Sequence, residues 1–76
     1  MYYVYVLKNK KTQDLYYGYS NNLKRRMTEH QAKGSWELKY YEAYMSEADA
    51  RDRERRLKHY AQALTALKQR IKRSLS

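Results

Sequence analysis

The pattern of hydrophobic and polar positions at the start of the chain predicts a β-hairpin. Residues 2–7 are rich in aromatic and β-branched side chains and are followed by a polar run at 8–11. Residues 14–19 form a second segment of this kind. Because only a short polar stretch joins the two segments, we expect them to pair as antiparallel strands. Gly18 is unusual inside a strand and indicates a bulge or a close approach to the backbone.

The middle of the chain predicts a helix and then a third strand. Ser20, Asn21 and Asn22 are residues that cap helix N-termini. Residues 23–33 follow with apolar positions four apart, and Gly34 is typical of the position after a helix ends. Residues 36–44 alternate weakly and contain a tryptophan and three tyrosines, which predicts a strand.

The last third of the chain predicts helices. Ser46 and Asp49 match a capping box, with Ser46 as the N-cap of a helix that reaches about residue 60. Residues 61–75 continue in helical register, and a bend near residues 59–60 would make them a third helix. The inward apolar stripe of this region is predicted to consist of Ala50, Leu57, Ala61 and Leu64.

This order of elements predicts an α+β fold: a small three-stranded antiparallel sheet flanked by two to three helices (ββαβαα). With 76 residues, the chain has room for one domain over residues 1–76. Cysteine is absent, which excludes a disulfide framework, and two histidines argue against a dedicated zinc cage. No apolar run is long enough to span a bilayer, and the first residues lack signal-peptide features. We therefore expect a soluble, cytoplasmic protein.

Charge indicates a polyanionic partner. The formal net charge is +9, from 17 Lys+Arg and 8 Asp+Glu. Residues 51–76 contain nine basic and two acidic side chains, so this third alone carries +7. Nucleic acid is the commonest partner of such a basic surface, although a solvated surface would look the same in sequence.

Polar residues interrupt both predicted helical stripes. In the first helix, His30 shares a face with Leu23 and Met27, and Arg26 lies four residues before His30. In the second, Glu54 lies on the inward stripe, where a carboxylate costs several kcal/mol unless a cation or metal compensates its charge. A salt bridge to Arg26 or a neighbouring arginine and a functional role are equally compatible with this pattern.

Tyrosine replaces phenylalanine throughout: the chain has 10 Tyr, no Phe and one Trp. A buried tyrosine hydroxyl needs a hydrogen-bond partner. Strand alternation places Tyr3, Tyr5 and Leu7 on one face of the first strand. The other face carries Tyr2, Val4 and Val6.

These residues complete a known pattern. The chain resembles the GIY-YIG nuclease family, and especially its small single-domain members, which look like the N-terminal nuclease module of an excinuclease. The two signature elements are Tyr3-Val4-Tyr5 and Tyr16-Tyr17-Gly18. Each triplet alone is a weak signal. The two triplets together, at this spacing, make a specific signal when Arg26, His30 and Glu54 follow them in order. The resemblance covers residues 2 to about 60.

The resemblance implies metal-dependent hydrolysis of DNA phosphodiester bonds. The implied catalytic residues are Tyr5, Tyr16, Arg26, His30 and Glu54. Glu54 would be the metal ligand, and a lone carboxylate suits Mg²⁺, or Mn²⁺ in its place. Arg26 would bind phosphate. Tyr5 or Tyr16 would be the general base, with a pKa lowered below the usual value of about 10 by the nearby cations. His30 would orient a tyrosine or move a proton.

The expected substrate contacts come from basic residues and one tyrosine: Tyr19, Arg25, Arg51, Arg55 and Lys58. Because phosphate contacts carry no sequence information, we expect structure-selective or nonspecific cutting, in DNA repair or processing. The loop at 31–35 is shorter than in small members of this family, where it helps to hold substrate. Larger members have a separate DNA-binding domain, so here the basic stretch 51–73 or a partner protein would supply the phosphate contacts, and double-strand cutting would need a homodimer. Two alternative functions are a noncatalytic nucleic-acid-binding module and a membrane-surface or partner-binding helix over residues 61–76.

Overall fold

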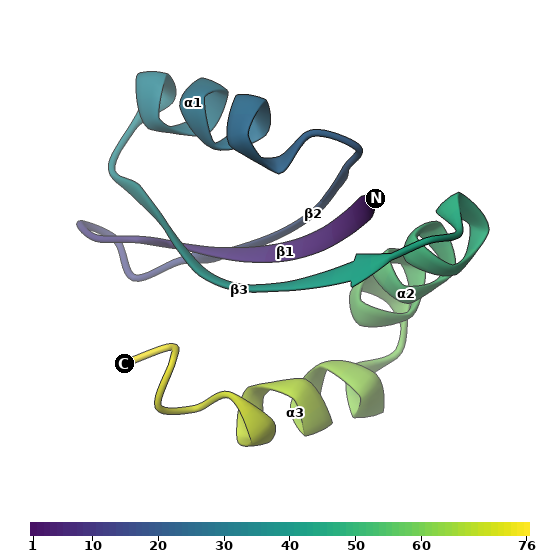
Figure 1. The fold of residues 1–76 in the computed structure, drawn as a ribbon. Coiled ribbons are helices and arrows are strands. Elements are labelled where there is room, and N and C mark those ends of the chain that lie inside the picture. Colours follow the sequence, from purple (N-terminus) through teal and green to yellow (C-terminus); the bar gives the residue numbers. More distant parts are fainter.

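The computed structural model describes all 76 residues and contains a three-stranded sheet and three helices (Figure 1). The elements are β1 (Tyr2–Asn9), β2 (Leu15–Ser20), α1 (Leu23–Lys33), β3 (Trp36–Tyr44), α2 (Glu47–His59) and α3 (Ala61–Arg70). The predicted α+β class and ββαβαα order are therefore confirmed. No helix is long and apolar enough to cross a membrane.

The sheet has the order β2-β1-β3, with β1 antiparallel to both neighbours. Tyr5 lies at its centre, opposite Gly18 on β2 and Tyr41 on β3. The register between β1 and β3 shifts between Val6 and Leu7. This placement makes Tyr5 the residue around which both edge strands are arranged.

The two sheet faces have different coverings. Figure 1 shows α1 on one side of the sheet and α3 on the other. The hydrophobic core lies on the α2 and α3 side and consists of Val4, Val6, Ala50, Leu57, Leu67 and Ile71. Tyr5 and Leu7, which alternate with Val4 and Val6, are also buried and face the α1 side. The predicted division of the first strand into two faces is confirmed.

One part of the predicted inward stripe is wrong. Ala61 is exposed and Leu64 only half-buried, whereas Ala50 and Leu57 are buried as predicted. The backbone is extended at Tyr60 (φ −117°, ψ 105°), so α3 starts a new helix whose phase is not that of α2. The core positions of the C-terminal region are therefore Leu67 and Ile71. Since both are buried, this apolar stripe is not free to lie on a membrane surface.

Side-chain caps fix the beginnings of α1 and α2. Asn22 Oδ1 accepts a hydrogen bond from the Arg25 backbone N–H at 3.0 Å. Ser46 Oγ accepts one from the Asp49 N–H at 3.3 Å, which confirms the predicted cap. At the other end of α1, Gly34 is extended rather than left-handed (φ 167°), so the helix ends there without needing glycine's conformational freedom.

A polar network joins β3 to α2. Arg53 Nε donates to the Glu42 carboxylate at 3.0 and 3.2 Å, and Arg53 Nη2 donates at 3.1 Å. The Tyr40 hydroxyl donates to the same carboxylate at 2.7 Å, and Tyr44 donates to its other oxygen. Burial alone would raise the pKa of Glu42, but these hydrogen bonds outweigh it and lower the pKa below 4.5. Glu42 therefore stays ionised and holds α2 against the sheet.

Replacing Glu42 by glutamine should weaken the fold. The side chain is 14% exposed, so the variant leaves Arg53 without its counter-charge in a largely desolvated position, and we expect a loss of about 2 kcal/mol in unfolding free energy. Urea denaturation at pH 7 measures it. Glu37→Gln is the control, because Glu37 is 41% exposed in its pairs with Lys10 and Lys39 and should cost under about 1 kcal/mol. Equal losses in the two variants would contradict the role of the network.

The network also sets the sign of the acid dependence. Because folding lowers the pKa of Glu42, its contribution is fully present above 4.5 and is lost as pH falls through the lower folded-state value. The stability difference between wild type and Glu42→Gln should shrink as pH is lowered from 5 toward about 2, measured by urea denaturation at each pH. A difference that is constant over this range would contradict the assignment.

Candidate active site

An aromatic cluster surrounds Tyr5 on the α1 face of the sheet. The Tyr5 hydroxyl lies 3.1 Å from Nε2 of His30, which projects from α1. The Tyr16 ring lies 4.9 Å from the His30 ring and 6.2 Å from the Tyr5 ring, between centroids. The structure thus brings together three predicted site residues from three elements.

Gly18 makes the position of Tyr5 possible. It is the cross-strand neighbour of Tyr5, and a Cβ built at position 18 would collide with the Tyr5 ring and hydroxyl. The Tyr5 ring therefore lies over the bare backbone of β2. The sequence signal at Gly18 is confirmed as a close approach rather than a bulge, since the β1–β2 register is continuous there.

Arg26 has unused hydrogen-bond donors. Its Nη1 is 3.7 Å from Glu29 Oε1, and its buried Nε has no partner. Its positive charge lowers the pKa of both Tyr5 and His30, so the guanidinium lies close to the cluster. A planar guanidinium with free donors suits a phosphate oxygen.

Folding shifts the pKa values of both Tyr5 and His30, and the pKa of Tyr5 rises where the sequence predicted a fall. Burial, together with the Tyr16 phenol, raises the pKa of Tyr5 to about 12 despite the opposing effect of Arg26. The expectation of a lowered pKa is therefore wrong for Tyr5 in the protein alone, because desolvation outweighs the nearby cation. Burial, Arg26 and Lys33 lower the pKa of His30 below 6.5. At neutral pH the pair is a phenol beside a neutral imidazole.

Glu54 lies on α2, near enough to the cluster to act on it electrostatically. Its negative charge raises the pKa of Tyr5, although α2 packs mainly on the other face of the sheet. The Glu54 carboxylate pairs with Lys58 at 3.1 Å and not with Arg26, so the ion pair with an arginine, one of the two alternatives left open by the sequence, does not form. Its side chain is 23% exposed and therefore accessible to a ligand. No group of three or more His, Cys, Asp or Glu side chains surrounds it.

The expected substrate contacts fall into two groups: four lie on or against α2, and the fifth, Arg25, lies on α1. Tyr19 packs against the core, donates a 2.7 Å hydrogen bond to Glu47, and has the Arg51 guanidinium 4.3 Å from its ring centroid. Both residues thus lie on the side of the sheet opposite Tyr5. Arg55 is paired with Asp52 within α2. Arg51 and Arg55 line one hollow together with Glu54, and Lys58 pairs with Glu54. Arg25 is exposed on α1.

Two residues near Tyr5 were not predicted. Trp36 packs edge-on against Tyr16 and His30, with ring centroids 6.2 and 6.5 Å apart. Glu29 pairs with Arg26 and influences the pKa of both Tyr5 and His30. The available signals were the single tryptophan at the start of a strand and an acidic residue three positions after Arg26.

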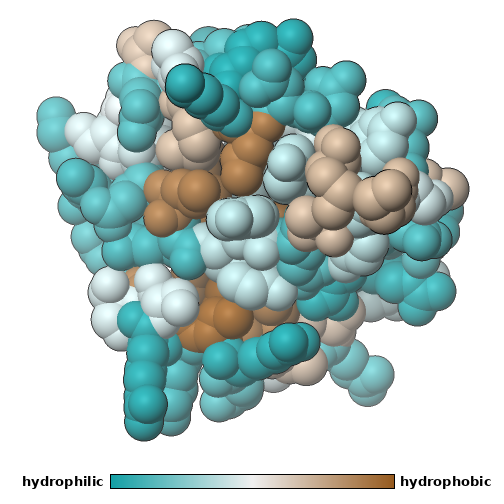
Figure 2. All heavy atoms as spheres, viewed as in Figure 1, coloured by the Kyte–Doolittle hydropathy of each residue, from teal (hydrophilic) through white to brown (hydrophobic).

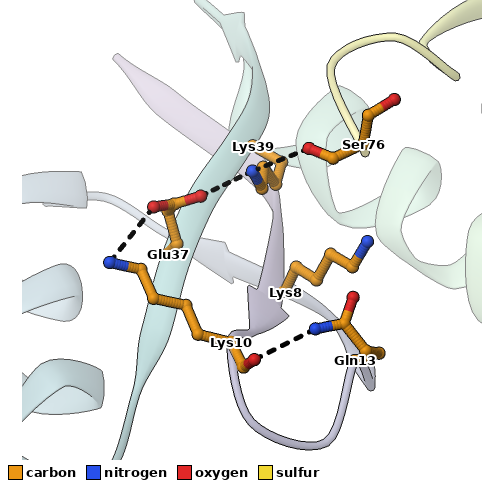
Figure 3. Close-up of a pocket in the computed structure, with 6 residues that line it drawn as sticks. All are labelled: Lys8, Lys10, Gln13, Glu37, Lys39 and Ser76. Carbon is orange, nitrogen blue, oxygen red and sulfur yellow. Dashed lines mark hydrogen bonds and ion pairs between the residues drawn. The ribbon is translucent and has the colours of Figure 1, made fainter.

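The surface away from the Tyr5 cluster is mostly hydrophilic on the face drawn in Figure 2. On the face drawn in Figure 2, strongly hydrophobic atoms are confined to small areas between pale and hydrophilic residues. Figure 3 shows a hollow lined by Lys8, Lys10, Gln13, Glu37, Lys39 and Ser76. Its lysines already have partners: Lys8 donates to the Leu75 carbonyl at 2.7 Å, and Lys39 donates to the Ser76 carbonyl at 3.3 Å. These bonds hold the C-terminal turn against the sheet.

Comparison with known families gives a match over most of the chain. The family model of the GIY-YIG catalytic domain matches residues 1–72. No curated protein and no solved structure gives a significant match. The match covers both tyrosine triplets and the helices that carry Arg26, His30 and Glu54.

Substituting alanine for Gly18 should disturb the site directly. The new Cβ collides with the Tyr5 ring, so we expect a loss of about 1–3 kcal/mol in unfolding free energy. Gly34→Ala is the matched control, because a Cβ there makes ordinary contacts with the Trp36 ring at 3.6 and 3.7 Å. Urea denaturation of both variants tests this. If Gly18→Ala is as stable as Gly34→Ala, Tyr5 does not need the bare backbone.

Proposed function

The chain belongs to the GIY-YIG family, and on that premise we propose that it is a metal-dependent DNA endonuclease. The observation that carries the proposal is the hydrogen bond between the Tyr5 hydroxyl and His30, beside the free donors of Arg26. Hydrolysis of a phosphodiester requires an activated water, a positive group for the phosphate and support for the leaving oxygen. The residues of the cluster match these needs.

Tyr5 is the proposed general base, and His30 takes the proton that Tyr5 must give up. With a pKa of about 12, the Tyr5 phenol holds its proton at neutral pH. His30 Nε2, at 3.1 Å, can accept that proton while the phenol oxygen takes one from the attacking water. The water oxygen then bonds to phosphorus and the bond to the leaving oxygen breaks. The Tyr16 ring packs against His30 and helps to hold the imidazole in place for this transfer.

Arg26 and Glu54 supply the remaining groups. Arg26 would donate to the phosphate oxygens. Glu54 would hold the divalent ion, and a single accessible carboxylate fits Mg²⁺ or Mn²⁺, which keep several waters and bind substrate phosphate as well. When bound, such an ion supports the developing charge on the phosphate and on the leaving oxygen. The ion pair with Lys58 keeps a cation beside Glu54 in the free protein.

The biological setting follows from the chemistry of the surface. Phosphate contacts by basic side chains favour structure-selective or nonspecific cutting, as in DNA repair or processing in the cytoplasm. A single cluster cuts one strand at a time, so double-strand cutting would require a homodimer or a partner protein. A noncatalytic DNA-binding module on the same fold is the alternative, and a nicking assay separates the two.

Glu54→Gln should abolish metal-dependent cutting without loss of the fold. We expect wild type to nick supercoiled plasmid and branched DNA with Mg²⁺ or Mn²⁺, and the variant to lose at least about 100-fold in rate. The control is Glu47→Gln, an acidic residue of the same helix that bonds to Tyr19 and Arg51 instead. Circular dichroism verifies folding. A wild type that binds DNA but never cuts it with either metal would favour the noncatalytic module.

Tyr5→Phe should lower the nicking rate by about 10²–10⁴, because only the hydroxyl that exchanges protons is removed. Tyr17→Phe, which loses a hydroxyl on the other sheet face, should retain wild-type activity. Rates from plasmid nicking test both variants. Equal activity of Tyr5→Phe and wild type would rule out Tyr5 as the base.

The pH profile should reflect His30. The imidazole must be neutral to accept a proton, and its pKa is lowered below 6.5. The rate should therefore be level near pH 7 and should fall only as pH drops below about 6.5, through the lowered pKa. Single-turnover cutting rates between about pH 5 and 8 measure this. A decline that begins above pH 7 would contradict a neutral, desolvated His30.

A further inference from the structure

Tyr41 is an exposed aromatic residue next to the candidate base. It is the cross-strand partner of Tyr5 in the β1–β3 register, and strand pairing places both side chains on the same face of the sheet. Yet Tyr5 is buried, whereas Tyr41 is 53% exposed. A large ring thus stands in solvent about one strand spacing, roughly 4.8 Å, from the strand that carries Tyr5.

The path of α1 explains this exposure. The helix begins at Leu23, just after the end of β2, and finishes at Lys33, just before the start of β3. Because β2 and β3 are the two edges of the sheet and run in the same direction, α1 must cross the face diagonally. Figure 1 shows it lying over this face. This path leaves Tyr41, three residues before the end of β3, exposed to solvent.

The Tyr41 ring packs against a neighbouring tyrosine and lies on the sheet face that the basic helix α1 crosses. Tyr3, on the same face, packs against Tyr41 in a T-shaped arrangement with centroids 6.0 Å apart. This contact limits the movement of the Tyr41 ring. The neighbouring helix α1 carries four basic residues, Lys24, Arg25, Arg26 and Lys33, against the single acidic residue Glu29. A stacking surface beside a basic helix is complementary to single-stranded nucleic acid.

We infer that Tyr41 stacks an unpaired base of the DNA strand whose phosphate lies at Tyr5 and Arg26. The inference rests on the proposed function for the identity of that strand. It also deepens that function, because a base inside an intact duplex is already stacked and cannot use the ring. The favoured substrate class is therefore DNA with a single-stranded or unpaired segment at the cut.

Binding without metal tests the stacking itself. The full chain in EDTA is titrated with a fluorescent 12-nucleotide oligo(dT), with a 12-unit abasic strand of equal charge, and with a 12-base-pair duplex. We expect wild type to bind oligo(dT) about tenfold more tightly than the abasic strand, since one stacked base contributes on that order. Tyr41→Leu should remove this difference and leave the abasic affinity unchanged. Tyr41→Phe, which keeps the ring, should bind like wild type.

Tyr60→Leu is the matched control. Tyr60 is 61% exposed but lies at the junction of α2 and α3, away from the sheet, so its loss should alter none of the affinities. Equal binding of oligo(dT) and the abasic strand by wild type would overturn the inference. The inference would also be overturned if Tyr41→Leu and Tyr60→Leu lost oligo(dT) affinity to a similar extent. It would fail likewise if Tyr41→Leu lost affinity for both oligo(dT) and the abasic strand.

The stacking and the nuclease proposal can fail separately. If base-dependent binding requires Tyr41 but plasmid is never nicked with Mg²⁺ or Mn²⁺, the stacking surface stands and the endonuclease proposal fails. If nicking occurs and requires Glu54 while Tyr41→Leu binds like wild type, the enzyme stands and the inference is wrong.

Discussion

The hydrogen bond between the buried Tyr5 hydroxyl and His30 is the interaction on which the site depends. A phenol at the centre of a sheet needs a partner for its hydroxyl and room for its ring. His30 on α1 provides the first, and Gly18 on β2 provides the second by having no side chain. The same burial that demands these partners raises the pKa of Tyr5 to about 12 and lowers that of His30. Because the two pKa values shift in opposite directions, the protonated Tyr5 phenol faces a neutral His30 imidazole at pH 7.

The hydrophobic core lies on one face of the sheet and the Tyr5–His30 cluster on the other. Helix α2 packs on the core and also carries Glu54. Ala50 and Leu57 fasten this helix to the core face, and Arg53 fastens it to β3 through Glu42. Glu54 follows Arg53 directly, so the network that holds α2 also fixes where this carboxylate stands. The opposite face has only a diagonal helix for cover. Tyr16 and Tyr41 on this face are therefore exposed to solvent, which a second covering helix would prevent.

Much of this arrangement follows from local rules in the sequence. Strand alternation placed Tyr5 and Val4 on opposite faces of the sheet. The unusual Gly18 indicated a bulge or a close approach, and the structure contains the close approach. Tertiary contacts decided the rest. The extended residue Tyr60 resets the helical phase, so Ala61 points outward. Glu54 forms its ion pair with Lys58, one helical turn away, and not with Arg26. Tyr19 lies on the face of β2 that packs against α2, where its hydroxyl donates to Glu47. The raised pKa of Tyr5 depends on how deeply the folded chain buries the ring, which no spacing reveals.

The most direct test of the central claim is the protonation state of the His30 ring, measured by ¹⁵N NMR of labelled protein. The account requires Nε2 to accept the hydrogen bond from Tyr5, so the neutral ring should carry its proton on Nδ1 at pH 7. Titration should give a pKa below 6.5, in line with burial and the nearby Arg26. A proton on Nε2, or a pKa above 6.5, would mean that His30 cannot take a proton from Tyr5 and would contradict the account.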